Sequence, residues 1–157
     1  MMHYVTGDAT APQGQGPSVI VHVCNDIGAW GAGFVLAISA KWSEPETQYR
    51  AWHKEGGSVP FELGATQIVA VEKNLWVANM IGQHKIKPRD GVPPVRYEAI
   101  KQCLNTVAIF AKEQKASVHM PRIGCGLAGG TWAEIGPIVE KTLVAQGVDV
   151  YVYDLPK

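Results

Sequence analysis

Short apolar segments rich in β-branched residues alternate along the chain with longer segments whose apolar positions follow the helical period. The short segments predict strands at residues 2–6, 18–23, 65–71, 75–81, 117–120 and 148–153. The longer segments predict helices at residues 34–41, 44–55, 95–115 and about 132–146. Only Glu72-Lys73-Asn74 separates the fourth strand from the third, which is the spacing of a β-hairpin.

Two of the predicted helices begin at polar residues of the kind that cap helices. Ser43 precedes Pro45, so we expect Ser43 to cap the helix at residues 44–55. Thr131 and Glu134 have the spacing of a capping box at the start of the last helix. Residues 34–41 are apolar almost all round, which indicates a buried helix, although their β-branched content leaves a strand as the alternative.

This order of elements predicts an α/β fold, a three-layer α/β/α sandwich with a central mixed sheet. The length of 157 residues suits one domain with one core, spanning residues 1–157. In sheets of this kind, ligands bind where strand ends meet glycine-rich turns.

The charge balance limits the classes of partner. Net charge is zero, which argues against a broad nucleic-acid surface or binding to an anionic membrane. The three cysteines are an odd number without a CxxC pair, so we expect reduced thiols, no metal ion and a cytoplasmic location. No apolar segment is long enough to span a bilayer, and the N-terminus lacks the pattern of a leader.

Two glycine-rich segments each lie between a predicted strand and a predicted helix. They are residues 28–33, which follow Asn25 and Asp26, and residues 123–130. Each alone is as often an ordinary tight turn, but two in one small domain favour a diphosphate site with the turns as opposite walls of one cleft. No lysine follows either glycine cluster, so we expect backbone N–H groups and helix dipoles to hold the anion.

The motifs around these turns carry a resemblance that covers nearly the whole chain. They are Val-His-Val-Cys-Asn with Ala-Trp-Gly-Ala-Gly-Phe, and Met-Pro-Arg-Ile-Gly-Cys-Gly-Leu with Thr-Trp. The set resembles the macro domain family, whose members bind ADP-ribose. It is most similar to the branch of small single-domain ADP-ribose 1″-phosphate phosphatases and terminal ADP-ribose glycohydrolases.

The resemblance implies a set of ligand-binding residues. Asp8 would accept a hydrogen bond from the adenine amino group, Asn25 would bind the distal ribose, and Tyr153 would lie near the adenine or proximal ribose. The phosphates and distal ribose would contact Trp30, Gly31, Ala32, Gly33, Phe34, Ile123, Gly124, Cys125, Gly126, Leu127 and Ala128. From the residues alone, Asp8 is more readily a turn residue at the strand end, Asn25 is equally a cap or turn residue, and a tyrosine in the last strand is often a core residue.

Candidate catalytic groups lie in and beside the first turn. They are Asn25, His22 and Asp26, with His84 as a further polar group. A histidine inside an apolar strand is more often a core residue than an acid or base, and Asp26 is equally a solvated turn residue. Trp30 is large for a glycine-rich turn, so we predict a lid over the sugar.

Two positions depart from the glycohydrolase pattern that the resemblance brings with it. Those enzymes have an aspartate where this chain has Ala128, and a lysine at the position that corresponds to Gln83. We therefore expect weak or absent glycohydrolase activity by a lysine-dependent route.

The sequence thus predicts a hydrolase acting on ADP-ribose 1″-phosphate or a related ADP-ribosyl derivative, without a cofactor. The alternative is a non-catalytic reader of ADP-ribose, free or on ADP-ribosylated macromolecules, and a third is another nucleotide in the same cleft. We expect a monomer that contacts neither membrane nor a broad stretch of nucleic acid.

Overall fold

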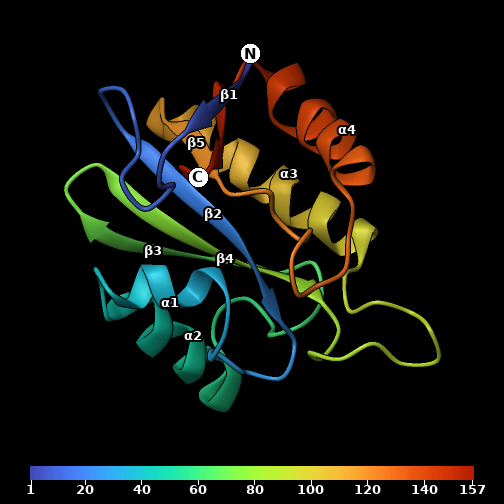
Figure 1. Cartoon of the computed structure of the whole chain (residues 1–157). Coiled ribbons are helices and arrows are strands. Elements are labelled where there is room, and N and C mark those ends of the chain that lie inside the picture. Colours follow the sequence, from blue (N-terminus) through green and yellow to red (C-terminus); the bar gives the residue numbers. More distant parts are fainter.

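The computed structural model describes residues 1–157, in which six strands, four α-helices and one short 3₁₀ helix follow one another (Figure 1). The strands are β1 (Met2–Thr6), β2 (Ser18–Asn25), β3 (Thr66–Glu72), β4 (Leu75–Gln83), β5 (Ser117–Met120) and β6 (Val150–Asp154). The helices are α1 (Phe34–Ser39), α2 (Glu44–Glu55), α3 (Tyr97–Gln114) and α4 (Trp132–Thr142), and the 3₁₀ helix is Val144–Gln146.

The six strands form one mixed sheet in the order β1-β6-β5-β2-β4-β3. All neighbouring pairs are parallel except β3 and β4, which form the predicted antiparallel hairpin. The register between β2 and β4 shifts between Cys24 and Asn25. Such an irregularity re-aims the side chain at the strand end, and here it lies directly before the first glycine turn.

Helices cover both faces of the sheet, α1 and α2 on one and α3 and α4 on the other (Figure 1). Alternate residues of β2 therefore enter two different cores. Val19 and Val21 pack in the larger core under α3 and α4, whereas Ile20 and Cys24 pack in the smaller core under α1 and α2. The predicted three-layer α/β/α fold with a central mixed sheet is confirmed.

The predicted capping interactions are wrong. Neither Ser43 nor Thr131 makes a side-chain cap hydrogen bond, and Ser43 already has a helical backbone conformation. The last helix also ends earlier than predicted, at Thr142, and a 3₁₀ turn closed by Gly147 follows it. Residues 34–39 are helical, so the strand alternative for this segment is excluded.

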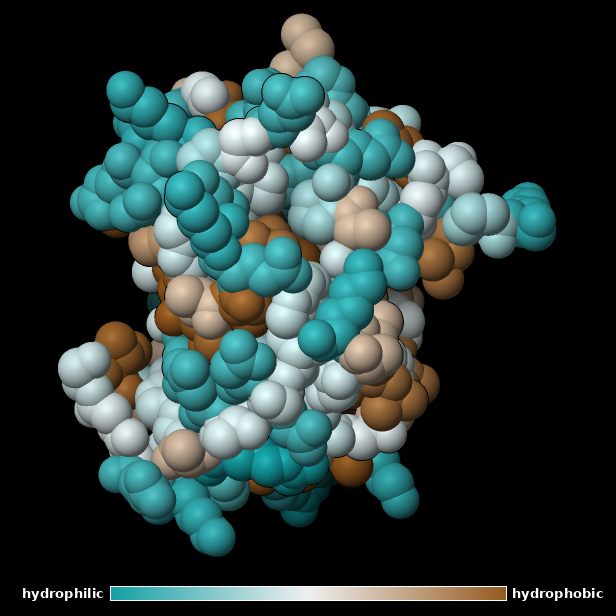
Figure 2. Space-filling view, turned by 90° about the vertical axis from the view of Figure 1, so that its left-hand side faces the viewer, coloured by the Kyte–Doolittle hydropathy of each residue, from teal (hydrophilic) through white to brown (hydrophobic).

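No helix in the structure combines the length and the apolar character that crossing a membrane requires. Figure 2 shows the side of the molecule that faces left in Figure 1, where the hydrophobic areas are small and separated by hydrophilic residues. This side therefore carries no continuous apolar surface of the kind that marks an interaction site. The carboxyl ends of β2 and β5 lie at the opposite edge of the sheet (Figure 1).

Candidate functional site

The site lies where two neighbouring parallel strands end and the chain leaves them in opposite directions. β2 and β5 pair in parallel, so their carboxyl ends lie at the same edge of the sheet. β2 leads through the first loop (residues 26–33) to α1, and β5 leads through the second loop (residues 121–131) to α4, on the other face. This is a topological switch point, the place where open α/β sheets bind ligands.

The first loop is built around the side chain of Asn25. Its Oδ1 accepts hydrogen bonds from the N–H groups of Ile27 at 3.1 Å and Ala29 at 3.0 Å, and its Nδ2 donates to the Ala29 carbonyl at 2.8 Å. The Tyr49 hydroxyl on α2 donates to the Asn25 carbonyl at 2.6 Å. The loop is therefore fixed before any ligand arrives.

The second loop is held by close backbone contacts among its glycines. The N–H of Gly130 donates to the carbonyl of Gly124 at 2.7 Å, and a Cβ at Gly130 would lie 2.6 Å from that same oxygen. Only glycine fits there. Burial raises the pKa of the Cys125 thiol, with Arg122 opposing the shift, and the thiol donates to the Ile123 carbonyl.

The two loops face each other with unused backbone donors. A Cβ at Gly33 would lie 3.6 Å from Cδ1 of Leu127, so the loops are neighbours, and nothing lies within 4 Å of the Cβ positions of Gly31 and Gly126. N–H groups that make no hydrogen bond within the protein belong to Gly31, Ala32, Gly33, Phe34, Gly124, Gly126, Leu127 and Ala128. Clustered free amides of this kind form an anion-binding site.

The ends of β1 and β6 bring Asp8 and Tyr153 to the same edge of the sheet. The N–H of Gly7 donates to the Asp154 carbonyl at 2.9 Å. Asp8 is exposed, and its Oδ1 accepts hydrogen bonds from the hydroxyl and the N–H of Thr10. The hydrogen bond from the Thr10 hydroxyl is the main cause of the lowered pKa of Asp8, and burial opposes this shift. Its Oδ2 makes no hydrogen bond within the protein, so it can accept one from a ligand.

Tyr153 is buried and its hydroxyl is already bonded. The hydroxyl accepts a hydrogen bond from the Gln13 N–H and lies 2.7 Å from Nδ1 of His119, whose Nε2 lies 2.7 Å from the Ser117 hydroxyl. Because its oxygen accepts from the Gln13 N–H, the Tyr153 hydroxyl donates its hydrogen bond to Nδ1 of His119. The ring proton then lies on Nε2, which donates to the Ser117 hydroxyl. His119 therefore cannot serve as a base for Ser117, and this row of side chains is structural.

A third loop (residues 84–96), between β4 and α3, closes the site. It projects from the edge at which β2 and β4 end (Figure 1). Nδ1 of His84 donates to Oδ2 of Asp26 at 2.7 Å, and the Lys85 N–H donates to Oδ1 at 2.7 Å. The Val95 N–H donates to the carbonyl of Ala128 at 2.9 Å, so the third loop is bonded to both glycine loops.

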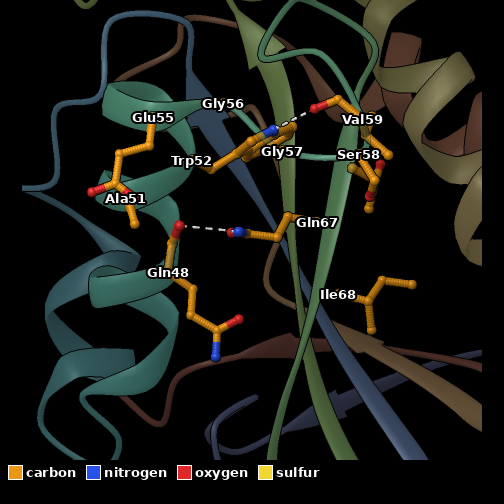
Figure 3. A pocket seen from close by; sticks show the side chains of 11 residues that line it. Gln48, Ala51, Trp52, Glu55, Gly56, Gly57, Ser58, Val59, Gln67 and Ile68 are labelled. Atoms are coloured by element: carbon orange, nitrogen blue, oxygen red, sulfur yellow. Dashed lines mark hydrogen bonds between the residues drawn. The ribbon is translucent and has the colours of Figure 1, made fainter.

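A cavity of about 380 Å³ lies elsewhere, between α2, β3 and residues 56–59. Figure 3 shows Trp52 bonded to the Val59 carbonyl at one end of this cavity, and Gln67 bonded to the Gln48 carbonyl beside it. None of the residues predicted for the site lines this cavity. It lies between α2 and β3, away from the carboxyl ends of β2 and β5 where the two glycine loops begin.

Comparison with known proteins identifies the family. No protein-family model matches the chain. A protein of unknown function from Bacteroides thetaiotaomicron has a solved structure that is 55% identical, with 98% of each chain covered and a TM-score of 0.95. The structure of a macrodomain protein from Streptomyces coelicolor is 54% identical, covers 98% of this chain and 99% of that one, and has a TM-score of 0.87.

This chain belongs to the macro domain family. A curated relative, the chromodomain-helicase-DNA-binding protein 1-like of Mus musculus, is 29% identical over 99% of this chain, which spans only 18% of that protein. The ADP-ribose 1″-phosphate phosphatase of Meyerozyma guilliermondii is 22% identical, over 96% of this chain and 98% of its own. DarTG of Thermosipho africanus, solved in complex with ADP-ribose, shares the fold at 19% identity and a TM-score of 0.70, with 88% of this chain and 38% of that one covered.

Within this macro domain, two predicted site residues lie behind the site. His22 is 2% exposed and its Nε2 is bonded to Oδ1 of Asn79 at 2.6 Å, so it is the core histidine that the apolar strand indicates. Trp30 is 5% exposed, packs edge-on against His22, and donates its indole N–H to Ser39. The predicted lid role of Trp30 and the catalytic role of His22 are therefore wrong, because neither ring reaches the loop surface.

The third loop of the macro domain was not predicted as part of the site. Of its residues, only His84 was named from the sequence, as a further polar group. The signal in the sequence is that this segment follows β4, which lies beside β2, but that adjacency appears only when the sheet has formed.

Arg122, at the start of the second loop, is held by Asp154 through two hydrogen bonds of 2.9 Å, so it is not a free phosphate ligand.

Proposed function

We propose that this macro domain binds ADP-ribose across the first and second loops. The observation that carries the proposal is the set of unbonded N–H groups on two facing loops at a topological switch point. The diphosphate would accept hydrogen bonds from these amides, the free Oδ2 of Asp8 would accept one from the adenine amino group, and the distal ribose would lie near Asn25. The relative solved with ADP-ribose supports this ligand.

Two roles of the bound ligand remain distinct proposals. Hydrolysis of ADP-ribose 1″-phosphate is supported by the phosphatases that match nearly the full length of this chain, and by the carboxylate of Asp26 with its histidine partner. Binding without catalysis is supported by Ala128 and Gln83, which replace the two groups of the glycohydrolase route. We favour hydrolysis and expect the macro domain to act as a single cytoplasmic domain and a monomer.

Calorimetry with ADP-ribose tests the ligand, using two matched variants. Gly33 and Gly56 have similar backbone conformations, with φ of 80° and 78° and ψ of −146° and −171°, but Gly56 follows α2 and lies outside the three loops. Gly33→Glu puts a carboxylate beside Leu127, where the diphosphate would lie. Because like charges placed side by side cost several kcal/mol, affinity should fall by at least about 100-fold.

Gly56→Glu carries a similar backbone strain and the same charge, so it should lose stability to a similar extent but keep its affinity for ADP-ribose. If the wild type gives neither heat of binding nor a thermal shift with ADP-ribose, the proposed ligand is wrong. Equal loss of affinity in both variants would show that Gly33 acts through stability rather than through the site.

Release of inorganic phosphate from ADP-ribose 1″-phosphate separates the two roles. A hydrolase should release phosphate steadily with excess substrate. Tight binding of ADP-ribose together with no phosphate release would leave the non-catalytic reader as the function.

A further inference from the structure

We propose that His84, oriented by Asp26, is the proton acceptor for the attacking water when this macro domain hydrolyses ADP-ribose 1″-phosphate. The inference rests on the hydrolytic role proposed above and assigns its base. Three observations carry it: the hydrogen bonds of the pair, the exposure of the free ring nitrogen, and the place of the pair among the three loops.

The hydrogen bonds fix the proton on one nitrogen of the ring. Both oxygens of the Asp26 carboxylate are acceptors, one for the Lys85 N–H and one for Nδ1 of His84 at 2.7 Å. Nδ1 must therefore carry the proton, which leaves Nε2 of the neutral ring with a free lone pair. A carboxylate that holds a histidine in this tautomer is the arrangement that general bases use in hydrolases.

The carboxylate itself stays ionised, as this arrangement requires. Burial pushes the pKa of Asp26 upward, but the hydrogen bonds from the Lys85 N–H and from His84 outweigh burial, and the net pKa is lowered. The Asp26 side chain is 16% exposed and the His84 side chain 39% exposed. The orienting group is thus sheltered while the ring remains accessible, and Nε2 makes no hydrogen bond within the protein.

The pair joins the walls of the site. Asp26 follows β2 in the first loop, and the His84 N–H donates to the Pro94 carbonyl at 2.8 Å within the third loop. The next residue, Val95, is bonded to Ala128 of the second loop. His84 is therefore the histidine at the junction of the three loops. His22 differs in both respects, because it is buried and its Nε2 is occupied by Asn79.

The reaction balances with water as the only co-reactant. The water oxygen forms a bond to phosphorus and one water proton passes to Nε2 of His84. The bond between phosphorus and the oxygen on the distal C1″ breaks, and its electron pair stays on that ribose oxygen, which takes a proton from solvent. Inorganic phosphate and ADP-ribose leave, and His84 returns its proton to solvent. The free amides of the glycine loops would face the charge on the phosphoryl group.

The test compares the wild type with His84→Ala, Asp26→Asn and the control His3→Gln, a change on β1. Phosphate release from ADP-ribose 1″-phosphate gives kcat and KM, and calorimetry gives affinity for ADP-ribose. Because general-base catalysis contributes roughly 100-fold or more, His84→Ala should lower kcat by at least about 100-fold. Its affinity for ADP-ribose should stay within about threefold, because ligand contacts are retained. Added imidazole should restore part of its turnover.

Asp26→Asn should lower kcat and change the tautomer of His84. ¹⁵N NMR of the imidazole measures the tautomer, and in the wild type it should show the proton on Nδ1. Wild-type turnover in His84→Ala, a parallel loss of kcat and affinity without imidazole rescue, or an Nε2–H tautomer in the wild type would each overturn the inference. If the wild type binds ADP-ribose but releases no phosphate, the inference falls and the binding proposal stands. If it does not bind ADP-ribose at all, both fall.

Discussion

The side chain of Asn25 holds the first loop together by hydrogen bonds. A substitution of Asn25 therefore affects the stability of the loop as well as any contact with a ligand. Its Oδ1 accepts hydrogen bonds from two loop N–H groups, those of Ile27 and Ala29, and it is 8% exposed. Nδ2 donates one hydrogen bond, to the Ala29 carbonyl, so its second N–H is available to a ligand. The predicted contact with the distal ribose therefore remains a prediction, but loop formation is the role that the hydrogen bonds support directly.

Asn25→Ala should lower the free energy of unfolding by about 2–4 kcal/mol, because two loop N–H groups and one carbonyl lose a buried partner. Urea denaturation measures the loss, and Asn105→Ala on the exposed side of α3 is the control, with an expected change below about 0.7 kcal/mol. Affinity for ADP-ribose should fall together with stability. A fully stable Asn25→Ala protein would contradict the loop-building role.

Two glycines of the second loop offer a matched pair. A Cβ at Gly130 would lie 2.6 Å from the Gly124 carbonyl oxygen, whereas a Cβ at Gly126 would meet nothing within 4 Å. Gly130→Ala should therefore destabilise the protein by about 1–3 kcal/mol through the forced backbone shift, and Gly126→Ala should change stability by less than about 0.5 kcal/mol. Thermal unfolding of both variants measures the difference; equal values would mean that the loop relaxes around the added methyl group.

Among the elements, α2 and α4 begin without the capping hydrogen bonds that their sequences predict. The residue at the cap position is of the right type in both helices, yet neither side chain makes the cap bond. In α4, the Thr131 carbonyl accepts from the N–H groups of Glu134 and Ile135, which is the ordinary first hydrogen bond of a helix. The Thr131 side chain therefore contributes no hydrogen bond to the start of α4.

Thr131→Ala should consequently cost less than about 0.5 kcal/mol of stability, where a side-chain cap would be worth about 1 kcal/mol. Chemical denaturation of this single variant is sufficient, because the two values differ by more than the scatter among surface substitutions. A loss of 1 kcal/mol or more would mean that Thr131 caps α4 in solution.

For the whole molecule, two buried histidines make stability depend on pH. Burial lowers the pKa of His22 and of His119 to about 4, although the hydrogen bond with Asn79 opposes the shift at His22. In the unfolded chain each titrates near its ordinary value of 6.5. Between these values the unfolded state binds more protons than the folded state, so protonation favours unfolding.

Stability should therefore be fully present above about pH 6.5 and should fall as the pH drops toward 4, by about 1.4 kcal/mol per pH unit for each histidine. Urea denaturation at several pH values between about 7.5 and about 5 measures the slope before the carboxylates begin to titrate. His22→Gln should roughly halve the slope. A free energy of unfolding that stays constant over this range would contradict the neutral, buried state of both rings.

The prediction from sequence succeeded where the signal was local. The apolar period and the glycine-rich turns were sufficient to locate the six strands and the four α-helices, because each element's pattern lies within the element itself, although the end of the last helix was placed too late. It failed at side chains whose surroundings come from distant segments. Trp30 in a glycine turn is compatible with a lid, and only the packing of α1 and α2 against β2 shows that its ring belongs to the smaller core.

The chain by itself determined the α/β class, the two glycine loops and the residues that the family motifs mark. Tertiary structure alone decided which strands are neighbours, because β2 pairs with β4 and β5, which come from later parts of the chain. That pairing joins Asp26 to His84 across 58 positions and sets the third loop beside the two glycine loops. Parallel strands bring their carboxyl ends together irrespective of their separation in sequence, so the site is a property of the sheet, which no local pattern encodes.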